Sequence, residues 1–580
     1  MKKTREKVDK VSLHECLRIF NDIKLPWGLM ITGIILALIG AYVTLEVSSF
    51  SGEAVDASGE IPVQEMIIYI IHSIILILCT GGRIITTMLS GEMINYALRQ
   101  KLWNKIIATK QSNYDLDGGE SMVSRVTTDC DFASRFYGTV VNVATLLVST
   151  IVYLVGMYQL NAQMANYVLL FIPVSLLLGV GYTILRFIVG HKVQANLSES
   201  TTYLVERTKD LPLIKTCNAQ EKELKEGMKH FKAQYDAQIL VGITTAVSQV
   251  IDSLMQMLSI AIPFLVGAYF VSEGIVTIGV VVTFNALYGN VRTVFNNLIL
   301  YVGDVKEANG ALARITNFLK LEEEKLEEGI AVSDEQEDIA LHEIDFGYTD
   351  ELIMKKFSCT IPKNKVTAIV GTNGSGKSTL LKLLTRLYEP QNGAIMFGEN
   401  NYSVYSLHSW RQKVCLIAQG SPMMAGTIRE NICYGRKDVV SDEELLEVAK
   451  RSHVYDFVKD LPDGFDTKVL AGGSNFSGGQ KQCIAIARAM LSKCDLLLLD
   501  EATSNLDVKR EKDVMDAMNQ LMKDKTTIII AHSLSTIKNA DHVIVINQGE
   551  LEMEGTPSYI MNQTDNYLNK MMSRKSSAII

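Results

Sequence analysis

The stretch Gly371-Thr-Asn-Gly-Ser-Gly-Lys-Ser-Thr379 decides how this sequence folds, because it fits the pattern G-x-x-x-x-G-K-[ST]. It lies directly after the apolar run Val366 to Val370 and before the helical pattern Leu380 to Leu387. Its glycines let successive backbone N–H groups point inward around a phosphate, while Lys377 offers a positive charge and the Ser378 hydroxyl suits Mg²⁺. A strand, a loop and a helix in this order predict an α/β domain with a phosphate-binding loop. The candidate phosphate-binding residues are Gly371, Thr372, Asn373, Gly374, Ser375, Gly376, Lys377, Ser378 and Thr379.

A second apolar strand, Leu496 to Leu499, ends in the two carboxylates Asp500 and Glu501. Beside a phosphate loop, two such carboxylates can divide the chemistry: Asp500 holds Mg²⁺ through water, while Glu501 orients and deprotonates an attacking water. For the pair taken alone, a solvated acidic turn is the alternative. Short β-branched runs such as Thr526 to Ile530 alternate with helical patterns from about residue 340 onward, which predicts a largely parallel sheet.

The composition excludes several classes of protein. Apolar residues make up 48% of the 580 residues and charged residues only 21%, so intrinsic disorder is excluded and a membrane-embedded portion is expected. The net charge of −8 offers no electrostatic argument for nucleic-acid binding. The nine cysteines are odd in number and include no C-x-x-C, which argues against a disulfide framework or a zinc site. We therefore expect reduced thiols and no nucleic-acid partner.

Six apolar stretches precede residue 305, and each is long enough to cross a bilayer at about 1.5 Å per residue. The amino-terminal segment and the connections 91–137 and 188–238 are rich in Lys and Arg, so the positive-inside rule places both termini in the cytoplasm and the protein in the cytoplasmic membrane. A cleavable signal peptide is disfavoured because no small-residue cleavage site follows the long basic region directly. The stretches are residues 27–47, 66–90, 138–158, 164–187, 239–271 and 275–302.

Composition also divides the chain into four parts. Leu13, Leu17, Phe20 and Ile23 recur at helical spacing, which is typical of a short amphipathic helix at a membrane surface. The stretch 321–339 is strongly acidic and polar, as linkers often are. The expected parts are a cytoplasmic amphipathic segment over 1–26, a transmembrane domain of six long helices over 27–317, an acidic linker over 318–339, and a nucleotide-binding domain with a helical subdomain over 340–580.

The motif Asn475-Phe-Ser-Gly-Gly-Gln480 is similar to the signature LSGGQ, and with the phosphate loop it makes the chain resemble an exporter-type ATP-binding cassette (ABC) half-transporter over essentially its whole length. At a helix start, the Ser477 hydroxyl and the Gly478 and Gly479 amides form a second anion site. The resemblance implies that this site closes on the ATP held by a second half-transporter. A dimer with two composite ATP sites is then expected; a homodimer is favoured and a heterodimer stays open. The signature residues expected to bind ATP are Ser477, Gly478, Gly479 and Gln480.

The same resemblance assigns roles to single residues. Tyr348 matches the aromatic residue on which adenine stacks, with a strand-edge tyrosine as the alternative. Gln419 resembles the glutamine that senses Mg²⁺, and Asp507 belongs to the loop that couples the two ATP sites. His532 is similar to the histidine that grips the γ-phosphate, so ATP and Mg²⁺ are the expected cofactors and Glu501 and His532 the expected catalytic residues.

Other positions match the family or depart from it. Residues 115–131 and 204–215 resemble its two coupling regions, which would transmit closure of the nucleotide domains. Phe476, Cys483 and Ser533 depart from the usual residues without removing a catalytic group. Leu470 and Ala471 stand where exporters often carry Gly-Glu, which affects the expected coupling between subunits more than the ATP chemistry.

Polar residues in the last two apolar stretches fall on helical stripes. Counted from the outer loops, Arg83, Asp252 and Arg292 lie at a similar depth, and ionisable groups there usually face a bundle interior. A polar, slightly basic transport pathway suited to amphiphiles is one interpretation; the other, equally weighted, is that Asp252 pairs with an arginine to lock helices together. The candidate pathway residues are Arg83, Gln249, Asp252, Gln256, Asn285, Arg292 and Asn296.

These observations predict ATP-driven export of a small or amphiphilic substrate, such as a drug, a lipid or a peptide-like molecule, by alternating access across the cytoplasmic membrane. Two alternatives remain open: one half of a heterodimeric exporter, and an ATP-gated channel or regulatory membrane protein built from the same parts. The expected partners are a second half-transporter, membrane lipid and the transported molecule.

Overall fold

The computed structural model describes residues 15, 18–57, 62–500, 508–531 and 533–562, apart from individual side chains within 116–120, 172–195, 295–300 and 508–512. The chain forms two compact units. The first comprises Met1–Ile107 and Gly119–Leu321, and the second comprises Ala108–Gly118 and Glu322–Ile580. The short segment 108–118 therefore belongs, by its contacts, to the second unit.

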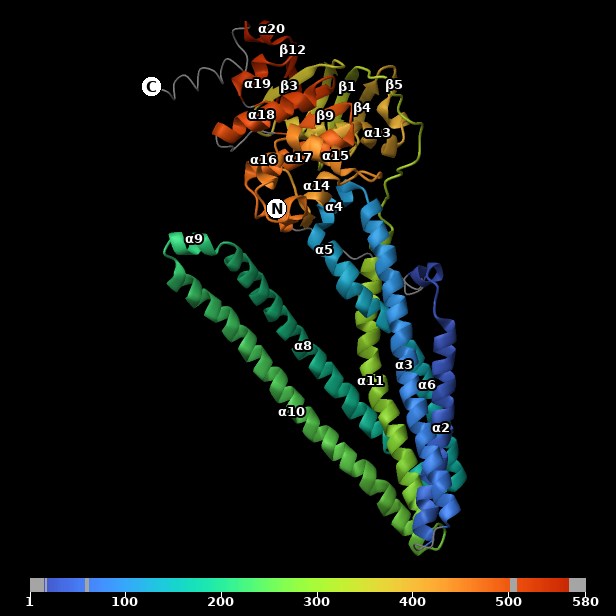
Figure 1. Ribbon diagram of the computed structural model, residues 1–580. Helices are drawn as coiled ribbons and strands as arrows, with labels where there is room; N and C mark the ends of the chain where they lie inside the picture. Colours follow the sequence, from blue (N-terminus) through green and yellow to red (C-terminus); the bar gives the residue numbers. More distant parts are fainter. Residues whose placement is uncertain (1–14, 16–17, 58–61, 501–507, 532, 563–580) are drawn as a thin grey trace. The chain divides into compact units, whose positions relative to one another are not determined.

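The described part of the first unit contains only helices (Figure 1). Its helices α3 and α10 have 46 and 53 residues, which at about 1.5 Å per residue exceeds the roughly 30 Å of a bilayer core. The elements are η1 Ile19–Asp22, α2 Trp27–Asp56, α3 Val63–Ala108, α5 Gly119–Ser124, the π-helical turn η2 Arg125–Asp129, α6 Cys130–Leu160, α7 Ala162–Leu169, α8 Ile172–Lys209, α9 Leu211–Thr216, α10 Gln220–Ser272 and α11 Ile278–Leu319.

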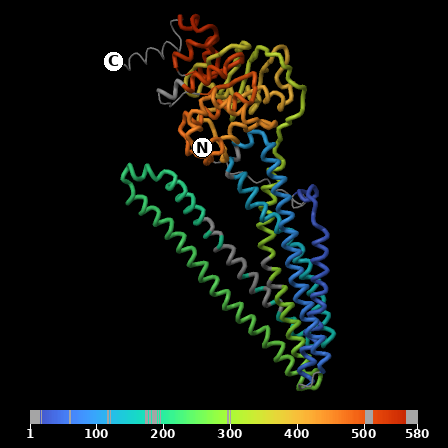
Figure 2. The backbone as a smooth tube through the Cα atoms, viewed as in Figure 1, coloured from blue at the N-terminus to red at the C-terminus, as the bar shows by residue number. Residues whose placement is uncertain are grey.

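Two groups of helices make up this unit. Helices α2, α6 and α11 pack along one another, whereas α8 and α10 run side by side as a long hairpin with α9 at its turn (Figure 2). Ile94, Leu98 and Leu102 of α3 recur every four residues, so they share one helix face, and they are buried in a core with residues of α6 and α11. Phe20 of η1 lies in the same core, and Asp22 accepts a hydrogen bond from Lys101 at 2.8 Å.

Four helices in the described part are long and apolar enough to cross a membrane, by length and composition: Trp27–Asp56, Val63–Ala108, Ser121–Leu160 and Gln220–Ser272. The apolar stretch expected over 164–187 is divided between two helices. Helix α7 ends at Leu169 and α8 begins at Ile172, with Pro173 in its first turn. Proline lacks a backbone N–H and suits the first turn of a helix better than its interior, which accounts for the break.

Helix α2 continues to Asp56, into the acidic link that precedes α3. The Asp56 carboxylate accepts hydrogen bonds from the Thr277 hydroxyl at 2.5 Å and from the Gly279 N–H at 2.7 Å. It thereby caps the amino terminus of α11, where the helix dipole stabilises a negative charge. One acidic residue of that link thus fixes the start of a distant helix.

The second unit is built on a six-stranded sheet with strand order β12-β11-β3-β10-β9-β6, in which β12 alone is antiparallel to its neighbour. A four-stranded antiparallel sheet (β2-β1-β4-β5) and a two-stranded one (β7-β8) accompany it. The strands are β1 Ile339–Phe346, β2 Met354–Ile361, β3 Val366–Gly371, β4 Asn392–Phe397, β5 Asn400–Asn401, β6 Val414–Ile417, β7 Gly426–Thr427, β8 Lys468–Val469, β9 Leu496–Leu499, β10 Thr526–Ile530, β11 His542–Asn547 and β12 Glu550–Gly555.

The central strands are buried on both faces. Ala368 and Val370 of β3 enter one apolar core, whereas Ile369 between them enters the core on the opposite face. Such continuous burial is typical of parallel strands covered by helices on both sides. The helices of this unit are α4 Gln111–Asp117, α12 Lys377–Leu384, η3 Tyr402–Val404, α13 Leu407–Lys413, α14 Ile428–Ile432, α15 Asp442–Arg451, α16 Tyr455–Val458, η4 Gly464–Asp466, η5 Ala471–Gly473, α17 Gly478–Ser492, α18 Val508–Met522, α19 Leu534–Lys538 and α20 Pro557–Met561. The predicted combination of a long-helix domain and an α/β domain with a largely parallel sheet is confirmed.

Candidate functional site

The loop between β3 and α12 surrounds a buried lysine. Lys377 is the first residue of α12, and its side chain is buried. Its Nζ donates hydrogen bonds to the carbonyl oxygens of Gly371 at 3.1 Å and Thr372 at 2.8 Å. The ammonium group is therefore held at the amino-terminal end of α12, where the helix dipole also favours an anion.

Glycines give this loop its shape. Gly374 and Gly376 have φ angles of +82° and +103°, in the left-handed region that glycine adopts without strain. A Cβ on Gly371 would lie 2.3 Å from the Ile546 carbonyl oxygen and 2.6 Å from Ser375 Oγ. Ser375 Oγ is buried and, among the described residues, has no hydrogen-bond partner, which leaves its hydroxyl available to an oxygen acceptor inside the loop.

The carboxyl ends of four strands meet beside this loop. Strand β6 pairs with β9 so that Ile417 lies opposite Leu499, and β10 pairs with both β9 and β3. Gln419 follows β6, and Asp500 follows β9 and donates its backbone N–H to the Ile417 carbonyl at 3.0 Å. Because these strands are parallel, Gln419, Asp500 and the phosphate-binding loop occupy one edge of the sheet. Glu501, Asp507 and His532 lie outside the described residues.

Tyr348 belongs to a cluster of three aromatic rings. Its ring centroid lies 5.1 Å from that of Tyr388 and 5.2 Å from that of Phe346, in edge-to-face geometry. Lys382 of α12 places its Nζ 4.9 Å from the Tyr348 ring centroid, and the Tyr348 hydroxyl lies 3.3 Å from Thr379 Oγ1. Tyr348 is thus fixed to the phosphate-loop helix, with 39% of its surface exposed. The sequence interpretation missed Lys382 and Tyr388. The only signal for this cluster in the sequence is an aromatic residue, Tyr388, shortly after α12.

The signature serine starts a well-capped helix. Ser477 is the N-cap of α17; its Oγ accepts the Gln480 N–H at 3.4 Å, and Gln480 Oε1 accepts the Ser477 N–H at 2.9 Å. This reciprocal capping box fixes the orientation of the first turn, which includes Gly478 and Gly479. Asn475 binds the Leu470 N–H and the Lys468 carbonyl, so the signature segment is attached to the loop at 469–473.

Three departures from the family pattern have structural counterparts. Phe476, which stands in place of the usual leucine, packs against the apolar core and lies 6.2 Å from the Phe457 ring, centroid to centroid. Cys483 is buried on the inner face of α17. The Ser533 hydroxyl accepts the Thr536 N–H at 3.2 Å and caps α19. These substitutions satisfy packing and capping within the chain.

The acidic linker is tied to the second unit by paired charges. Arg411 donates to both carboxylate oxygens of Glu324, at 2.6 and 2.7 Å, and also to the Thr385 and Arg386 carbonyls after α12. Glu324 donates its backbone N–H to the Ala108 carbonyl at 2.7 Å. The linker therefore connects the phosphate-loop helix to the chain that leads into α4. Arg411, which makes the bidentate contact, was not predicted as a functional residue.

Helix α4 overlaps the first expected coupling region at residues 115–117 and is bound to the aromatic cluster. The Tyr388 hydroxyl donates a hydrogen bond to the Asp115 carboxylate. Burial, followed by the Asp115 carboxylate, raises the pKa of the Tyr388 phenol, which therefore remains a protonated donor. A groove of about 1940 Å³ opens beside these residues and is lined by Tyr348, Tyr388 and Lys110 among others.

We expect Tyr388→Phe to loosen α4 while leaving the aromatic cluster in place. A hydrogen bond to a carboxylate contributes about 2 kcal/mol, so local opening of α4 should become about thirtyfold more frequent. Hydrogen–deuterium exchange of the peptide that covers Gln111–Asp117 measures this change. Tyr402→Phe is the matched control, because that buried hydroxyl has no hydrogen-bond partner among the residues described. Equal exchange in the two variants would show that Asp115 does not hold α4.

The residues present fit ATP and Mg²⁺. The loop offers inward N–H groups, a buried ammonium and the Ser375 hydroxyl, which together suit a polyphosphate chain. Ser378, Gln419 and Asp500 supply hydroxyl, amide and carboxylate oxygens, the donor set that Mg²⁺ prefers beside phosphates. No group of three or more His, Cys, Asp or Glu side chains gathers in the described part of the chain, which is compatible with an ion held largely by phosphate oxygens and water.

The candidate pathway residues lie on α3, α10 and α11. Gln249, Asp252 and Gln256 of α10 are exposed, and Asn285 and Arg292 of α11 are half-buried. In the described ranges, Asp252 forms no ion pair with Arg83 or Arg292, so helix locking by such a pair is not observed. Arg83 Nη1 instead donates to Asn142 Oδ1 at 3.2 Å, and the side chain of Asn296 lies outside the described residues.

The fold and the site define a class: a membrane-spanning helical domain joined to an α/β domain that binds ATP. A family profile described as ABC transporter matches residues 354–504, and one described as ABC transporter transmembrane region matches residues 30–294. Together these profiles cover more than half of the chain. The chain belongs to the ABC transporter family: it is a membrane ATPase of the exporter type whose ATP hydrolysis is coupled to transport, with the half-transporter arrangement that implies a dimer.

Known relatives agree with this assignment. A multidrug resistance ABC transporter ATP-binding and permease protein of Lactococcus lactis subsp. cremoris (strain MG1363) is 29% identical, over 94% of this chain and 93% of its own length. An ATP-dependent lipid A-core flippase of Syntrophus aciditrophicus (strain SB) is 29% identical, over 87% and 84%. ABC transporter B family member 17 of Arabidopsis thaliana is 31% identical over 82% of this chain but only 39% of that longer protein.

Proposed function

We propose that this chain is one subunit of a homodimeric exporter that moves amphiphilic molecules of the drug or lipid type by alternating access. The observation that carries the proposal is the pairing, in one chain, of one phosphate-binding loop with one capped signature helix. Each subunit then contributes its phosphate-binding loop to one composite site and its signature helix to the other. Two identical chains therefore suffice to build two complete sites. The names of the relatives from Lactococcus lactis and Syntrophus aciditrophicus support drugs and lipids as substrate classes.

In the proposed site, Tyr348 stacks on adenine and the phosphate-binding loop holds the phosphates. Lys377 and the loop N–H groups neutralise their charge, and Ser378, Gln419 and Asp500 hold Mg²⁺ directly or through water. Bound Mg²⁺ would supply charge neutralisation to the β- and γ-phosphate oxygens. Glu501 orients the attacking water and accepts its proton, while His532 contacts the γ-phosphate.

The signature segment acts on the partner's nucleotide in this proposal. Ser477 and the Gly478 and Gly479 amides contact the γ-phosphate held by the other subunit, and Gln480 keeps that turn in place through its capping bond. Asp507 belongs to the loop that connects the two sites. The coupling regions 115–131 and 204–215 then pass closure of the nucleotide-binding domains to the membrane helices.

We also propose the membrane arrangement. Six spans lie within a transmembrane domain over 27–317, with the amphipathic segment 1–26, the linker 318–339 and the nucleotide-binding domain 340–580 on the cytoplasmic side of the cytoplasmic membrane. In a dimer, the polar residues exposed on α10, among them Gln249, Asp252 and Gln256, would face the pathway together with Asn285, Arg292 and Asn296 of α11.

Accumulation of a fluorescent amphiphile in proteoliposomes tests the proposal. Purified chain is reconstituted with its nucleotide-binding domains outward, and ATP is added outside. Export is supported if the amphiphile accumulates above its external concentration and if Ser477→Ala abolishes this accumulation. Ser452→Ala, at the buried carboxyl-terminal cap of α15, should leave the accumulation unchanged. Equilibration without accumulation would instead identify an ATP-gated channel, because a channel cannot concentrate a solute. Activity that requires co-expression of a second half-transporter would replace the homodimer by a heterodimer.

A further inference from the structure

We propose that a cavity within the helix bundle of a single subunit binds the anionic group of an amphiphile, with Arg83 as its charged contact. The inference rests on the proposed export function, for which it names the chemical class of substrate and the place of its charged end. The cavity lies between α2, α3, α6 and α11 and has a volume of about 190 Å³.

The cavity has both apolar and polar walls. Leu36, Leu76 and Leu146 supply apolar surface from three different helices. Hydroxyl, amide and guanidinium groups supply the polar surface. The polar residues that line it include Thr44, Thr80, Arg83, Ser149, Asn290 and Thr293. A ligand with a hydrocarbon portion and a hydrogen-bonding head group matches this mixture better than a free ion does, because a free ion would remove no apolar surface of the leucines from water.

Among the described residues, Arg83 is the only charged one in the cavity wall. It is half-buried, and its Nη1 donates a 3.2 Å hydrogen bond to the neutral amide oxygen of Asn142. Within the described ranges no carboxylate pairs with it. A guanidinium carries five N–H donors in a planar fork, so most of its donors remain for a planar or tetrahedral oxyanion.

The apolar surroundings of Arg83 make its charge informative. Arg83 lies within the apolar stretch 66–90 of α3, and Leu76 and Leu146 line the same cavity wall. A cation is costly in such surroundings unless an opposite charge accompanies it. Asp252, the acidic residue of the candidate pathway, does not line the cavity. A carboxylate, phosphate or sulfate group of a ligand would supply the missing negative charge.

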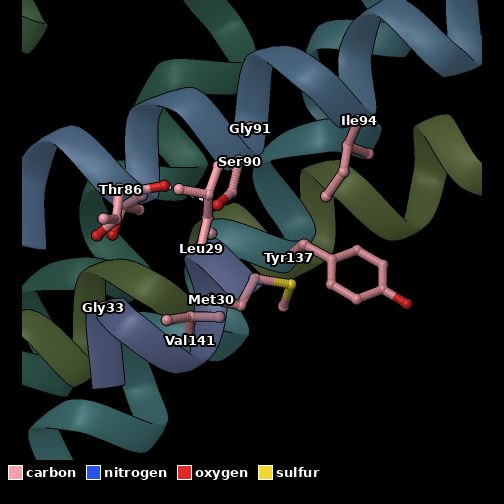
Figure 3. A pocket seen from close by; sticks show the side chains of 11 residues that line it. Leu29, Met30, Gly33, Thr86, Ser90, Gly91, Ile94, Tyr137 and Val141 are labelled. Carbon is pink, nitrogen blue, oxygen red and sulfur yellow. Dashed lines mark hydrogen bonds between the residues drawn. The ribbon is translucent and has the colours of Figure 1, made fainter. Parts of the chain in front are cut away.

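A second pocket in the same bundle lacks these features. It has a volume of only about 10 Å³ and is lined by residues of α2, α3 and α6, including Met30, Tyr137 and Val141 (Figure 3). The hydroxyls of Thr86 and Ser90 donate to carbonyl oxygens of their own helix, and no charged residue lines the pocket. The larger cavity is therefore the one equipped to select an anion.

Binding of radiolabelled 1-oleoyl lysophosphatidic acid to the purified full chain, measured by scintillation proximity without ATP, tests the site. We expect saturable binding that unlabelled lysophosphatidic acid displaces and that uncharged 1-oleoylglycerol does not. Arg83→Gln should weaken binding by about tenfold or more, because a buried charge contact is lost, whereas Arg83→Lys should retain most of it. Arg135→Gln, which removes an exposed arginine from α6, is the matched control.

Cys79 provides a second readout that reports on the cavity itself, because its buried thiol lines the wall next to Arg83. Peptide-resolved mass spectrometry follows the labelling of Cys79. We expect an anionic methanethiosulfonate reagent to label Cys79 several times faster than a cationic one, and this preference to be lost in Arg83→Gln. An unchanged preference in Arg83→Gln would overturn the anion site even if that variant failed to bind lipid because it was misfolded.

The remaining outcomes separate the two proposals. If inorganic phosphate displaced the radiolabelled lipid at the same concentration as unlabelled lysophosphatidic acid, the site would bind a free anion. That result would overturn the proposal that its ligand is an amphiphile. Equal displacement by 1-oleoylglycerol would overturn the role of the charge. Positive binding and labelling in a chain that fails to accumulate substrate would contradict the export function while supporting the cavity, since neither measurement requires ATP or transport.

Discussion

A chain that carries Glu501→Gln is expected to bind ATP, to remain in a closed dimer, and to hydrolyse ATP about a hundredfold or more slowly. The substitution preserves the size of the side chain and removes its ability to accept a proton from water, and general base catalysis contributes about 10²- to 10⁴-fold. The phosphate-binding loop is unaltered, so affinity for ATP should persist. Because hydrolysis resets the proposed cycle, the closed state should accumulate.

Steady-state phosphate release and size-exclusion chromatography with ATP measure the two effects. Glu443→Gln, an exposed residue in the first turn of α15, is the matched control and should hydrolyse ATP at the normal rate. Hydrolysis by the Glu501→Gln chain within a few-fold of the normal rate would remove Glu501 from the role of base. Normal dimerisation with slow hydrolysis supports Glu501 as the general base, whereas loss of ATP binding would point to a structural role for Glu501.

The strands were the most predictable part of the fold. The runs Val366 to Val370, Leu496 to Leu499 and Thr526 to Ile530 became β3, β9 and β10 with nearly identical bounds. Strands buried on both faces must be apolar throughout, so their sequences stand out from the amphipathic helices around them. The phosphate-binding loop could be located for the same reason, because its pattern lies between one such strand and a helix.

Contacts between distant residues were not predictable. Tyr388 and Asp115 are 273 positions apart, and Arg411 and Glu324 are 87 apart. Neither pair leaves a periodic pattern in the sequence, because each depends on how separate elements pack in three dimensions. The acidic stretch around Glu324 was interpreted as a linker from its composition alone, and the structure adds that its charges are largely partnered: Lys110 pairs with Glu322 and Lys413 with Asp334.

The interpretation of the membrane region shows a third kind of limit. Helical spacing predicts stripes of polar residues on α10 and α11, but counting residues along a helix gives depth and not neighbours. Arg83, Asp252 and Arg292 share a depth by count, yet Arg83 contacts Asn142 and lines a cavity that Asp252 does not. Helix packing decides which residues at one level meet, and that packing is not encoded in spacing alone.

Lys377→Ala should abolish tight ATP binding and, with it, both hydrolysis and transport. Its ammonium is buried and lies at the start of α12, so alanine would remove a positive charge from a site of low dielectric, where one such group contributes about 10²- to 10³-fold. The Gly371 and Thr372 carbonyls would also lose a donor, at a cost of about 1 kcal/mol each to the loop.

Fluorescence titration with a labelled ATP analogue measures the affinity, and the melting temperature of the chain without nucleotide measures the fold. Lys377→Met retains the length of the side chain without its charge, and Lys363→Ala, a half-exposed lysine whose Nζ lies 3.7 Å from a carboxylate oxygen of Glu337, is the control. If Lys377→Met bound ATP normally while Lys377→Ala did not, the lysine would act by filling space in the loop. Equal loss in both variants, with a melting temperature within a few degrees of the unsubstituted chain, assigns the effect to the charge that α12 holds at the phosphates.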